Sequence, residues 1–568
     1  MKRRLAAAFL MAALITGTLS GCGRESMDVT TSDVTDTGAE EYFTTEAEED
    51  GYYDVAPFEG NSYPAEEMAE GEIEESRDES YAESCYIYDW PAENTEEYSQ
   101  WEEKGFSSVM KEPLSTFSAD VDTASYSNLR RMIIDGYALS DIPEGAVRIE
   151  EMLNYFTYDY KDPEGSEPFG VTTEISECPW NEDAQLLMIG LKTEDVDYTD
   201  APPSNLVFLL DVSGSMNDYD KLPLLQESFG LLAENLTDKD RISIVTYAGE
   251  DRVVLEGVSG DKTAKIKRAI NSLEASGGTN GSKGIETAYQ IAEENFIEGG
   301  NNRIILATDG DLNIGLTSEE ELEELITEKK ESGIYLSVLG FGTGNIKDNK
   351  METLADKGNG NYAYIDSFRE AKKVLVNEMT ATLLTICKDV KFQVEFNPAV
   401  VSDYRLVGYE NRALNKEDFN DDTKDAGEIG AGHSVTVMYE IILKEPLASL
   451  SEEEISDLKY GENYKEELEE AGPSNALDEE WLTISIRYKK PAEDESNLLQ
   501  YPVDYDSYKT DPSEDFQFAG AVAEFGLLAS HSNYPEDASV KHVLSVLGDL
   551  NLEDEYKSEF EDLVKEVQ

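Results

Sequence analysis

The sequence contains few histidines, few cysteines and few basic residues. Its 568 residues include 3 His, 4 Cys and 46 Lys+Arg against 121 Asp+Glu, giving a formal net charge of −75. Three scattered histidines (His433, His531 and His542) argue against a histidine-rich zinc site or a histidine-based catalytic triad. Four cysteines cannot staple a chain of this length as a disulfide scaffold. Because a charge of −75 repels phosphate backbones, we expect no nucleic-acid partner.

Long apolar runs are also missing. A basic start, MKRR, precedes the apolar stretch from Leu5 to Ile15, which is too short to span a hydrocarbon core of about 30 Å. The following Leu19-Ser20-Gly21-Cys22 resembles a bacterial lipobox, in which the cysteine receives a lipid. We therefore predict a signal peptide at residues 1–21, lipidation of Cys22 and attachment to the extracytoplasmic face of the cell membrane. An ordinary signal peptide beside a cysteine is the alternative, and no transmembrane pore is expected because no other run reaches about 18 apolar residues.

The segment after Cys22 has few aliphatic residues. Residues 24–105 hold 27 Asp+Glu and 3 Lys+Arg, a net charge of −24, with no helical or strand period. Such a composition cannot offset the conformational entropy lost on ordering. We therefore predict that residues 22–105 are a lipid-anchored, disordered acidic tether. The rest of the chain, from 106 to 568, still carries −54.

The centre of the chain alternates predicted strands and helices. Residues 206–210 (LVFLL) and 304–308 (IILAT) are short apolar runs typical of strands buried on both faces. Leucines at helical spacing over 221–236 and an amphipathic pattern over 284–296 predict helices. This alternation predicts an α/β fold with a mostly parallel sheet covered by helices on both faces. Ligand sites in such sheets lie beyond the carboxyl ends of the strands.

Three polar clusters occur at these predicted strand ends and loops. They are DVSGS at 211–215, GGTNG at 277–281 and TDGD at 308–311. Each supplies carboxylate or hydroxyl oxygens and none supplies Cys or His, a donor set that favours Mg²⁺ or another hard divalent cation over Zn²⁺ or Cu²⁺. The alternative is that these side chains cap the helices that follow.

The three clusters together resemble the metal-ion-dependent adhesion site of von Willebrand factor type A domains. The resemblance implies a Rossmann-like open sheet, with Ser213 and Ser215 as direct hydroxyl ligands and Thr279 as a direct or water-mediated ligand. It implies that Asp211 and Asp309 hold coordinated waters and orient the hydroxyls. The expected cofactor is Mg²⁺, with Mn²⁺ or Ca²⁺ left open. The expected ligand is an Asp or Glu carboxylate of a partner.

Further segments are similar to one bacterial lipoprotein family over about 113–568. Members have an N-terminal segment, a von Willebrand factor type A domain and a C-terminal domain, and are often labelled calcium-activated chloride channel homologues. The channel label does not fit a chain without a membrane-spanning segment. The segments are PLSTFSADVDTASYSNLRR (113–131), RIEEMLNYF (148–156), FIEGGNNRIILATDGDLNIG (296–315), GFGTGNIKDNKMETLADKGNGNYAYIDS (340–367) and LVGYENRALNKEDFNDDTKDAGEIGAGH (406–433).

The flanks of the central domain predict a β-sandwich into which that domain is inserted. Strands are expected at 169–177 and 185–192 before it, and at 390–396, 404–409, 434–443, 482–488 and 498–503 after it. The resulting domains are 106–200 (helices, then strands), 201–386 (von Willebrand factor type A) and 387–568 (β-rich, then helical). Residues 113–160 are expected to be mainly helical, 368–384 one helix, and 447–473 an acidic helical insertion.

Two cysteines and one acidic motif have more than one interpretation. Cys178 and Cys387 lie on either side of the central domain, so they either form a disulfide or remain free thiols. Asp120 and Asp122 mimic the start of a phosphatase motif, but Ala124 departs from it, so we expect a cap for the following helix.

From these features we expect a lipid-anchored binding or adhesion module rather than an enzyme. Its metal site would capture a carboxylate on a protein or cell-wall partner. The alternatives are an envelope protein assembly or folding factor and a metal-assisted hydrolase. The sequence does not identify the partner, the oligomeric state or the role of the C-terminal domain.

Overall fold

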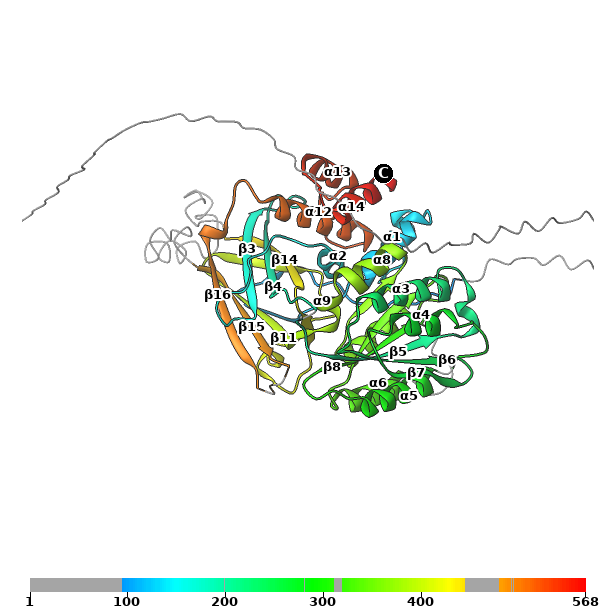
Figure 1. The fold of residues 1–568 in the computed structure, drawn as a ribbon. Helices are drawn as coiled ribbons and strands as arrows, with labels where there is room; N and C mark the ends of the chain where they lie inside the picture. The colour runs from blue at the N-terminus through cyan, green and yellow to red at the C-terminus, as the bar shows by residue number, and fades with distance from the viewer. Residues whose placement is uncertain are drawn as a thin grey trace, which may run out of the picture. The chain divides into compact units, whose positions relative to one another are not determined.

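The computed structural model describes residues 94–198, 200–279, 281–310, 319–444, 480–491, 493 and 495–567. The predicted signal peptide, Cys22, most of the acidic tether and the 447–473 insertion lie outside these residues. The described residues form three sheets and the helices that cover them (Figure 1). None of the described helices has the length and apolarity needed to cross a bilayer.

The central sheet has six strands in the order β10-β9-β8-β5-β6-β7. Neighbouring strands are parallel except β6 and β7. This confirms the predicted open α/β sheet. The strands are β5 (Ser204–Asp211), β6 (Arg241–Tyr247), β7 (Asp251–Ser259), β8 (Asn301–Thr308), β9 (Tyr335–Phe341) and β10 (Tyr362–Ile365).

Helices cover both faces of this sheet because alternate residues of its buried strands point to opposite sides. Leu206, Phe208 and Leu210 of β5 pack in the core under α3 and α4. Val207 and Leu209 pack in the other core, under α5 and α7. Figure 1 shows α3 and α4 on one side of the sheet and α5 and α6 on the other. The helices are α3 (Leu222–Asn235), α4 (Thr263–Asn271), α5 (Gly281–Glu294), α6 (Glu319–Lys330), α7 (Asp348–Lys357), α8 (Phe368–Lys372) and α9 (Met379–Leu383).

The two flanks fold together into an antiparallel β-sandwich, as predicted. One sheet has the order β1-β12-β14-β4-β3, and the other has the order β13-β11-β15-β16, with β2 paired to β11. Residues from both sheets share one hydrophobic core, so the central domain is inserted between β4 and β11. The strands are β1 (Ser107–Ser108), β2 (Leu114–Ser118), β3 (Phe169–Glu177), β4 (Gln185–Thr193), β11 (Thr385–Phe396), β12 (Val401–Val407), β13 (Gly427–Gly430), β14 (Ser434–Leu443), β15 (Glu480–Lys489) and β16 (Asn497–Asp504).

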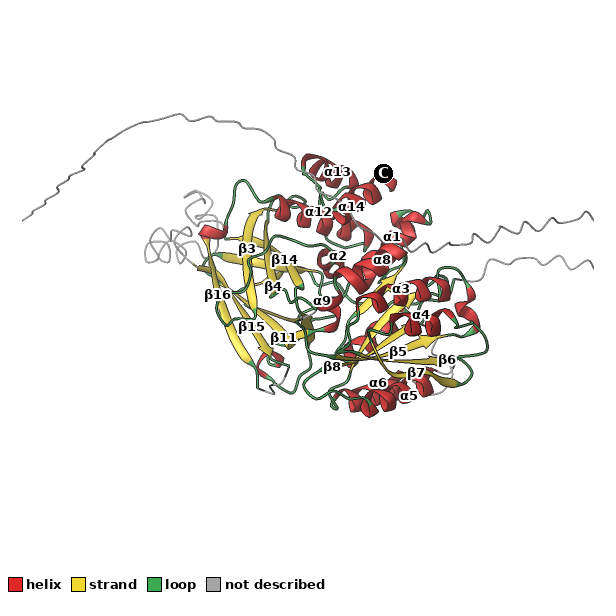
Figure 2. Ribbon diagram, in the orientation of Figure 1, coloured by secondary structure: helices red, strands yellow, loops and turns green. Residues whose placement is uncertain are grey.

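A helical layer from both ends of the described chain packs on the outer face of the sandwich (Figure 2). Leu186 and Met188 of β4 and Met438 of β14 contribute to its core. The helices are α1 (Ala124–Ile134), α2 (Ile149–Asn154), α12 (Glu514–Ala529), α13 (Val540–Asp549) and α14 (Glu555–Glu566).

Four expectations differ from the structure. Residues 114–118 form strand β2 rather than helix, because Phe117 pairs with Phe392 on the edge of β11 and their rings stack. The 368–384 helix is interrupted by a π-helix at 373–377, which ends where the Glu378 N–H reaches the carbonyl of Lys373. Residues 94–98, which belong to the segment expected to be disordered, make specific contacts that are described below.

The fourth difference concerns Asp120 and Asp122, which do not cap the following helix. The N-cap position of α1 is Thr123, without a side-chain capping bond. Both carboxylates instead accept hydrogen bonds from Arg412, and the second also accepts the N–H of Tyr362 on β10. The structure also resolves the cysteine alternatives, because Cys178 and Cys387 are both buried free thiols.

Buried arginines join the flanks to the inserted domain. Arg148, before α2, lies 2.7 Å from the Asp348 carboxylate at the start of α7. Arg130 on α1 lies 2.6 Å from Asp366, after β10. These side chains are at most 6% exposed, so each charged group has lost most of its hydration. Each therefore depends on the opposite charge of its partner to compensate for that loss. The inserted domain is therefore held to its flanks by charge as well as by its two chain connections.

Candidate metal site

Two buried carboxylates lie at the carboxyl ends of adjacent strands. Strands β5 and β8 pair in parallel, with Leu210 opposite Ala307. Asp211 ends β5 and Asp309 follows β8, and both side chains are fully buried. Strand pairing alone therefore brings together two acidic residues that are almost a hundred positions apart.

Hydrogen bonds fix the orientation of the Asp211 carboxylate. Its Oδ1 accepts the backbone N–H of Ser213 at 2.8 Å, and its Oδ2 accepts the hydroxyl of Thr308 at 3.0 Å. The Thr308 oxygen in turn accepts the N–H of Gly310 at 3.1 Å, which ties the Asp211 side chain to the loop that carries Asp309.

The serine hydroxyls of the first cluster face one another. The Oγ atoms of Ser213 and Ser215 lie 3.0 Å apart. Ser213 is the N-cap residue of the short 3-10 helix Gly214–Asn217, yet its side chain makes no capping hydrogen bond. The capping alternative therefore does not account for the Ser213 hydroxyl, which remains available as a ligand.

The loop that carries Thr279 lies directly against the first cluster. The N–H of Gly214 donates to the carbonyl of Gly277 at 3.1 Å, and the N–H of Ser276 donates to Val212 at 2.8 Å. Gly277 has a φ of 83°, a conformation that glycine adopts at little cost. Thr279 is 6% exposed and precedes α5. Asn280 lies outside the described residues.

Lys221 is a further residue of the site, which the sequence did not reveal. Its ammonium lies 3.1 Å from Oδ2 of Asp309 and donates to Oδ1 of Asn345 at 2.7 Å, although the residue is only 4% exposed. Its side chain passes beside Gly342, where an added Cβ would lie 2.3 Å from the lysine Cε. The sequence signal that could have indicated this role is a lysine placed directly before an apolar helix in a strongly acidic chain.

The electrostatics of the site favour a bound cation. Burial, reinforced by the nearby charge of Asp309, raises the pKa of Asp211 from 3.8 to about 6. The Lys221 ammonium offsets one of the two carboxylates, so one negative charge remains when both are ionised. A divalent cation would relieve the remaining cost of burying Asp211 in ionised form.

The donor set fits a hard divalent cation. It combines carboxylates and hydroxyls, which are the oxygen ligands preferred by Mg²⁺, Mn²⁺ and Ca²⁺. Across the described ranges no group of three or more His, Cys, Asp and Glu is placed to hold a metal, so this mixed carboxylate and hydroxyl set differs from a cysteine or histidine site.

Sheet order, helical cover and this strand-end constellation define a von Willebrand factor type A domain, and the comparisons agree. The von Willebrand factor type A domain family matches residues 205–377. A family described as von Willebrand factor matches residues 92–188, and one described as the C-terminal part of the uncharacterized protein YfbK matches residues 381–568.

The chain belongs to the family of the uncharacterized protein YfbK of Escherichia coli. The two are 42% identical over 480 residues, which cover 83% of this chain and 81% of the relative. The human inter-alpha-trypsin inhibitor heavy chain H4 is 30% identical over 148 residues, but the match covers only 16% of that protein.

Two solved structures match this chain at low overall similarity. The von Willebrand factor type A protein from Catenulispora acidiphila is 15% identical, with a TM-score of 0.40 over 72% of this chain and 90% of that one. The proximal thread matrix protein 1 of the mussel byssus, in a structure described as having a zinc-occupied MIDAS motif, is 23% identical, with a TM-score of 0.27 over 33% and 46% of the two chains.

Proposed function

We propose that this protein is a lipid-anchored, extracytoplasmic binding module that captures a partner carboxylate through a divalent cation. The observation that carries the proposal is the convergence of Asp211, Asp309 and the Ser213 and Ser215 hydroxyls at one edge of the sheet. The lipobox ending at Cys22 supports attachment to the cell membrane.

Each side chain has a defined task in this proposal. The Ser213 and Ser215 hydroxyls would be direct ligands, and Thr279 would complete the set from the adjoining loop. Asp211 would orient the first serine through the bond to its N–H and, with Asp309, would hold metal-bound water. When bound, the cation supplies Lewis acidity toward a carboxylate oxygen.

The engagement of both carboxylates supports binding rather than catalysis. Asp211 accepts hydrogen bonds from Ser213 and Thr308, and Asp309 accepts one from Lys221, so each is held in a positioning role rather than poised as a general base. Mg²⁺ is our first choice of cation, since oxygen-only ligands with water in the shell are typical of its sites.

Calorimetry with Mg²⁺ tests the metal site. We expect saturable Mg²⁺ binding to the wild type and none to Asp211→Ala. The control Asp218→Ala, which changes an exposed residue on the same loop, should bind Mg²⁺ as the wild type does. Equal Mg²⁺ affinity in the wild type and Asp211→Ala would refute the proposal.

Crosslinking on cells then identifies the class of partner. A surface adhesion role predicts metal-dependent capture of cell-wall or surface components through their Asp or Glu side chains. Capture of co-exported proteins that have not yet completed folding would instead support an assembly factor.

A further inference from the structure

Residues 94–98, which we call the strap, lie along the loop between β9 and α7, beside the metal site. The strap pairs in parallel with the loop between β9 and α7, with Glu97 opposite Lys347. The N–H of Thr95 donates to Gly344 at 2.8 Å, and the N–H of Glu97 donates to Ile346 at 2.9 Å. These backbone bonds hold the loop on both sides of Asn345.

Charged side chains reinforce this docking. The Lys347 ammonium donates to the Thr95 carbonyl and to the Glu97 carboxylate, both at 2.6 Å. The Glu96 carboxylate accepts the N–H of Gly344 at 2.9 Å. The strap is therefore joined to the loop by backbone and side chain alike.

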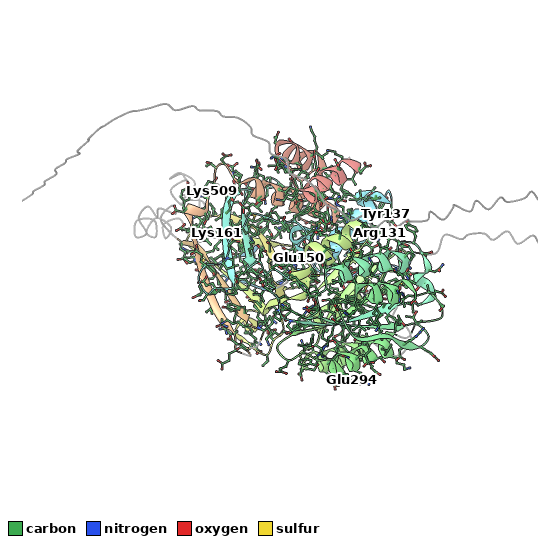
Figure 3. All side chains as sticks on the ribbon, viewed as in Figure 1. Arg131, Tyr137, Glu150, Lys161, Glu294 and Lys509 are labelled. Atoms are coloured by element: carbon green, nitrogen blue, oxygen red, sulfur yellow. The ribbon has the colours of Figure 1, made fainter. Side chains whose placement is uncertain are left out.

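The other side of the strap is fixed to helix α1. Arg131, labelled in Figure 3, lies 3.1 Å from Glu96, whose side chain is only 3% exposed. The Tyr98 hydroxyl donates to Glu96 at 2.8 Å and accepts from Asn128 at 3.0 Å. The strap thus bridges α1 of the N-terminal segment and the metal-site loop of the inserted domain.

The loop transmits this docking to the metal site through two side chains. Asn345 lies between Gly344 and Ile346, the two residues whose carbonyls bond the strap. Its Oδ1 accepts a hydrogen bond from the Lys221 ammonium at 2.7 Å, and the same ammonium lies 3.1 Å from Asp309. Asn345 therefore shares the ammonium with a candidate metal ligand. If the loop shifts, the ammonium loses this acceptor and Asp309 remains as its charged partner.

We propose that the strap sets the divalent-cation affinity of the metal site through Asn345 and Lys221. With the strap docked, Asn345 accepts one of the hydrogen bonds of the Lys221 ammonium, so that Asp309 can also interact with the cation. With the strap released, the ammonium settles on Asp309 and competes with the cation by charge repulsion. Lys221 and Asn345 are thus positioning residues.

This inference rests on the proposed function and adds its regulation. The strap directly follows the acidic N-terminal segment in the sequence. By thermodynamic linkage, a cation that binds more tightly with the strap docked must stabilise the docked strap by the same factor.

A double-mutant cycle with Mg²⁺ as the probe tests the relay in the full chain. Glu97→Pro removes the N–H that bonds Ile346, and we expect it to weaken Mg²⁺ binding by about 3- to 30-fold. Lys221→Met removes the ammonium while keeping the side-chain length, and we expect binding at least about tenfold tighter than wild type. In the Lys221→Met background, Glu97→Pro should then change the Mg²⁺ affinity little.

A second strap variant tests whether misfolding explains the effect of Glu97→Pro. Lys347→Met removes two strap contacts without altering the backbone and should reproduce the weakening. Lys357→Met, at the far end of helix α7, which begins directly after Lys347, should not. Hydrogen exchange supplies an independent readout, since saturating Mg²⁺ should slow exchange at the Thr95 and Glu97 amides.

The outcomes separate the relay from the metal site. If the wild type binds Mg²⁺ and Asp211→Ala does not, but both strap variants bind as the wild type does, the relay is wrong and the metal site stands. The relay is also wrong if Glu97→Pro weakens binding equally with Lys221 and with Met at that position. If the wild type binds no Mg²⁺, the metal site and the relay fail together.

Discussion

The substitution Asp211→Asn measures the electrostatic cost built into the metal-free site. Asp211 is fully buried, and burial together with Asp309 raises its pKa from 3.8 to about 6. At ~1.4 kcal/mol per tenfold change in the acid dissociation constant, ionised Asp211 lowers the free energy of unfolding at pH 7 by about 3 kcal/mol. Asparagine carries no charge and keeps an oxygen for the Ser213 N–H.

The sign of the pH dependence follows from the direction of this pKa. Between pH 3.8 and about 6 the folded protein retains a proton on Asp211 that the unfolded chain has released. The contribution of Asp211 to the free energy of unfolding therefore falls as the pH rises through this window and stays lowered above it. Asp211→Asn lacks this loss, so its advantage over the wild type should grow across the same window.

Urea unfolding in EDTA at a series of pH values from 4 to 8 provides the assay. We expect Asp211→Asn to exceed the wild type by about 1–3 kcal/mol at pH 7 and by much less at pH 4. Saturating Mg²⁺ should stabilise the wild type and leave the variant unchanged. Asp218→Asn is the matched control and should differ little from the wild type. A variant no more stable than the wild type at pH 7 would refute this electrostatic reasoning.

Three further predictions follow from the buried groups. Arg148→Met leaves buried carboxylates without their partner and should lower the free energy of unfolding by about 3–5 kcal/mol, as measured by urea unfolding, whereas the exposed Arg241→Met should change it little. Although burial acts to raise it, the pKa of Glu96 is held below 4.5 by Arg131 and by the hydrogen bonds of the carboxylate. The protection of the strap amides in hydrogen exchange should therefore persist above pH 4.5 and decline as the pH falls through the lowered pKa of Glu96. Without reductant, both buried cysteines should react with iodoacetamide only after unfolding, and a bridged pair seen by mass spectrometry would contradict the free thiols.

Local sequence patterns predicted the sheet and the positions of the candidate ligands. The apolar runs 206–210 and 304–308 are typical of buried strands, and parallel strands place Asp211 and Asp309 at one edge. Ser213 and Ser215 lie just after Asp211 in the same predicted loop, and the resemblance to von Willebrand factor type A domains marks them as ligands. The strand-end argument therefore located most of the candidate site without any tertiary information.

The contacts that depend on tertiary packing could not be predicted in this way. Lys221 approaches Asp309 across 88 positions, and its burial depends on the shape of the Gly342 loop. The strap shares the acidic composition of the segment before it, and only its pairing with the 344–348 loop distinguishes it. Strand β2 has little apolar alternation and forms because β11 offers it an edge.

Anomalous diffraction from crystals grown with Mn²⁺ tests the central claim most directly, because it locates the cation without relying on activity. We predict a strong peak within coordinating distance of the Ser213 and Ser215 hydroxyls, between Asp211 and Asp309, that disappears in Asp211→Ala crystals. Mn²⁺ peaks found only elsewhere, with the Lys221 ammonium still against Asp309, would contradict a metal-dependent site.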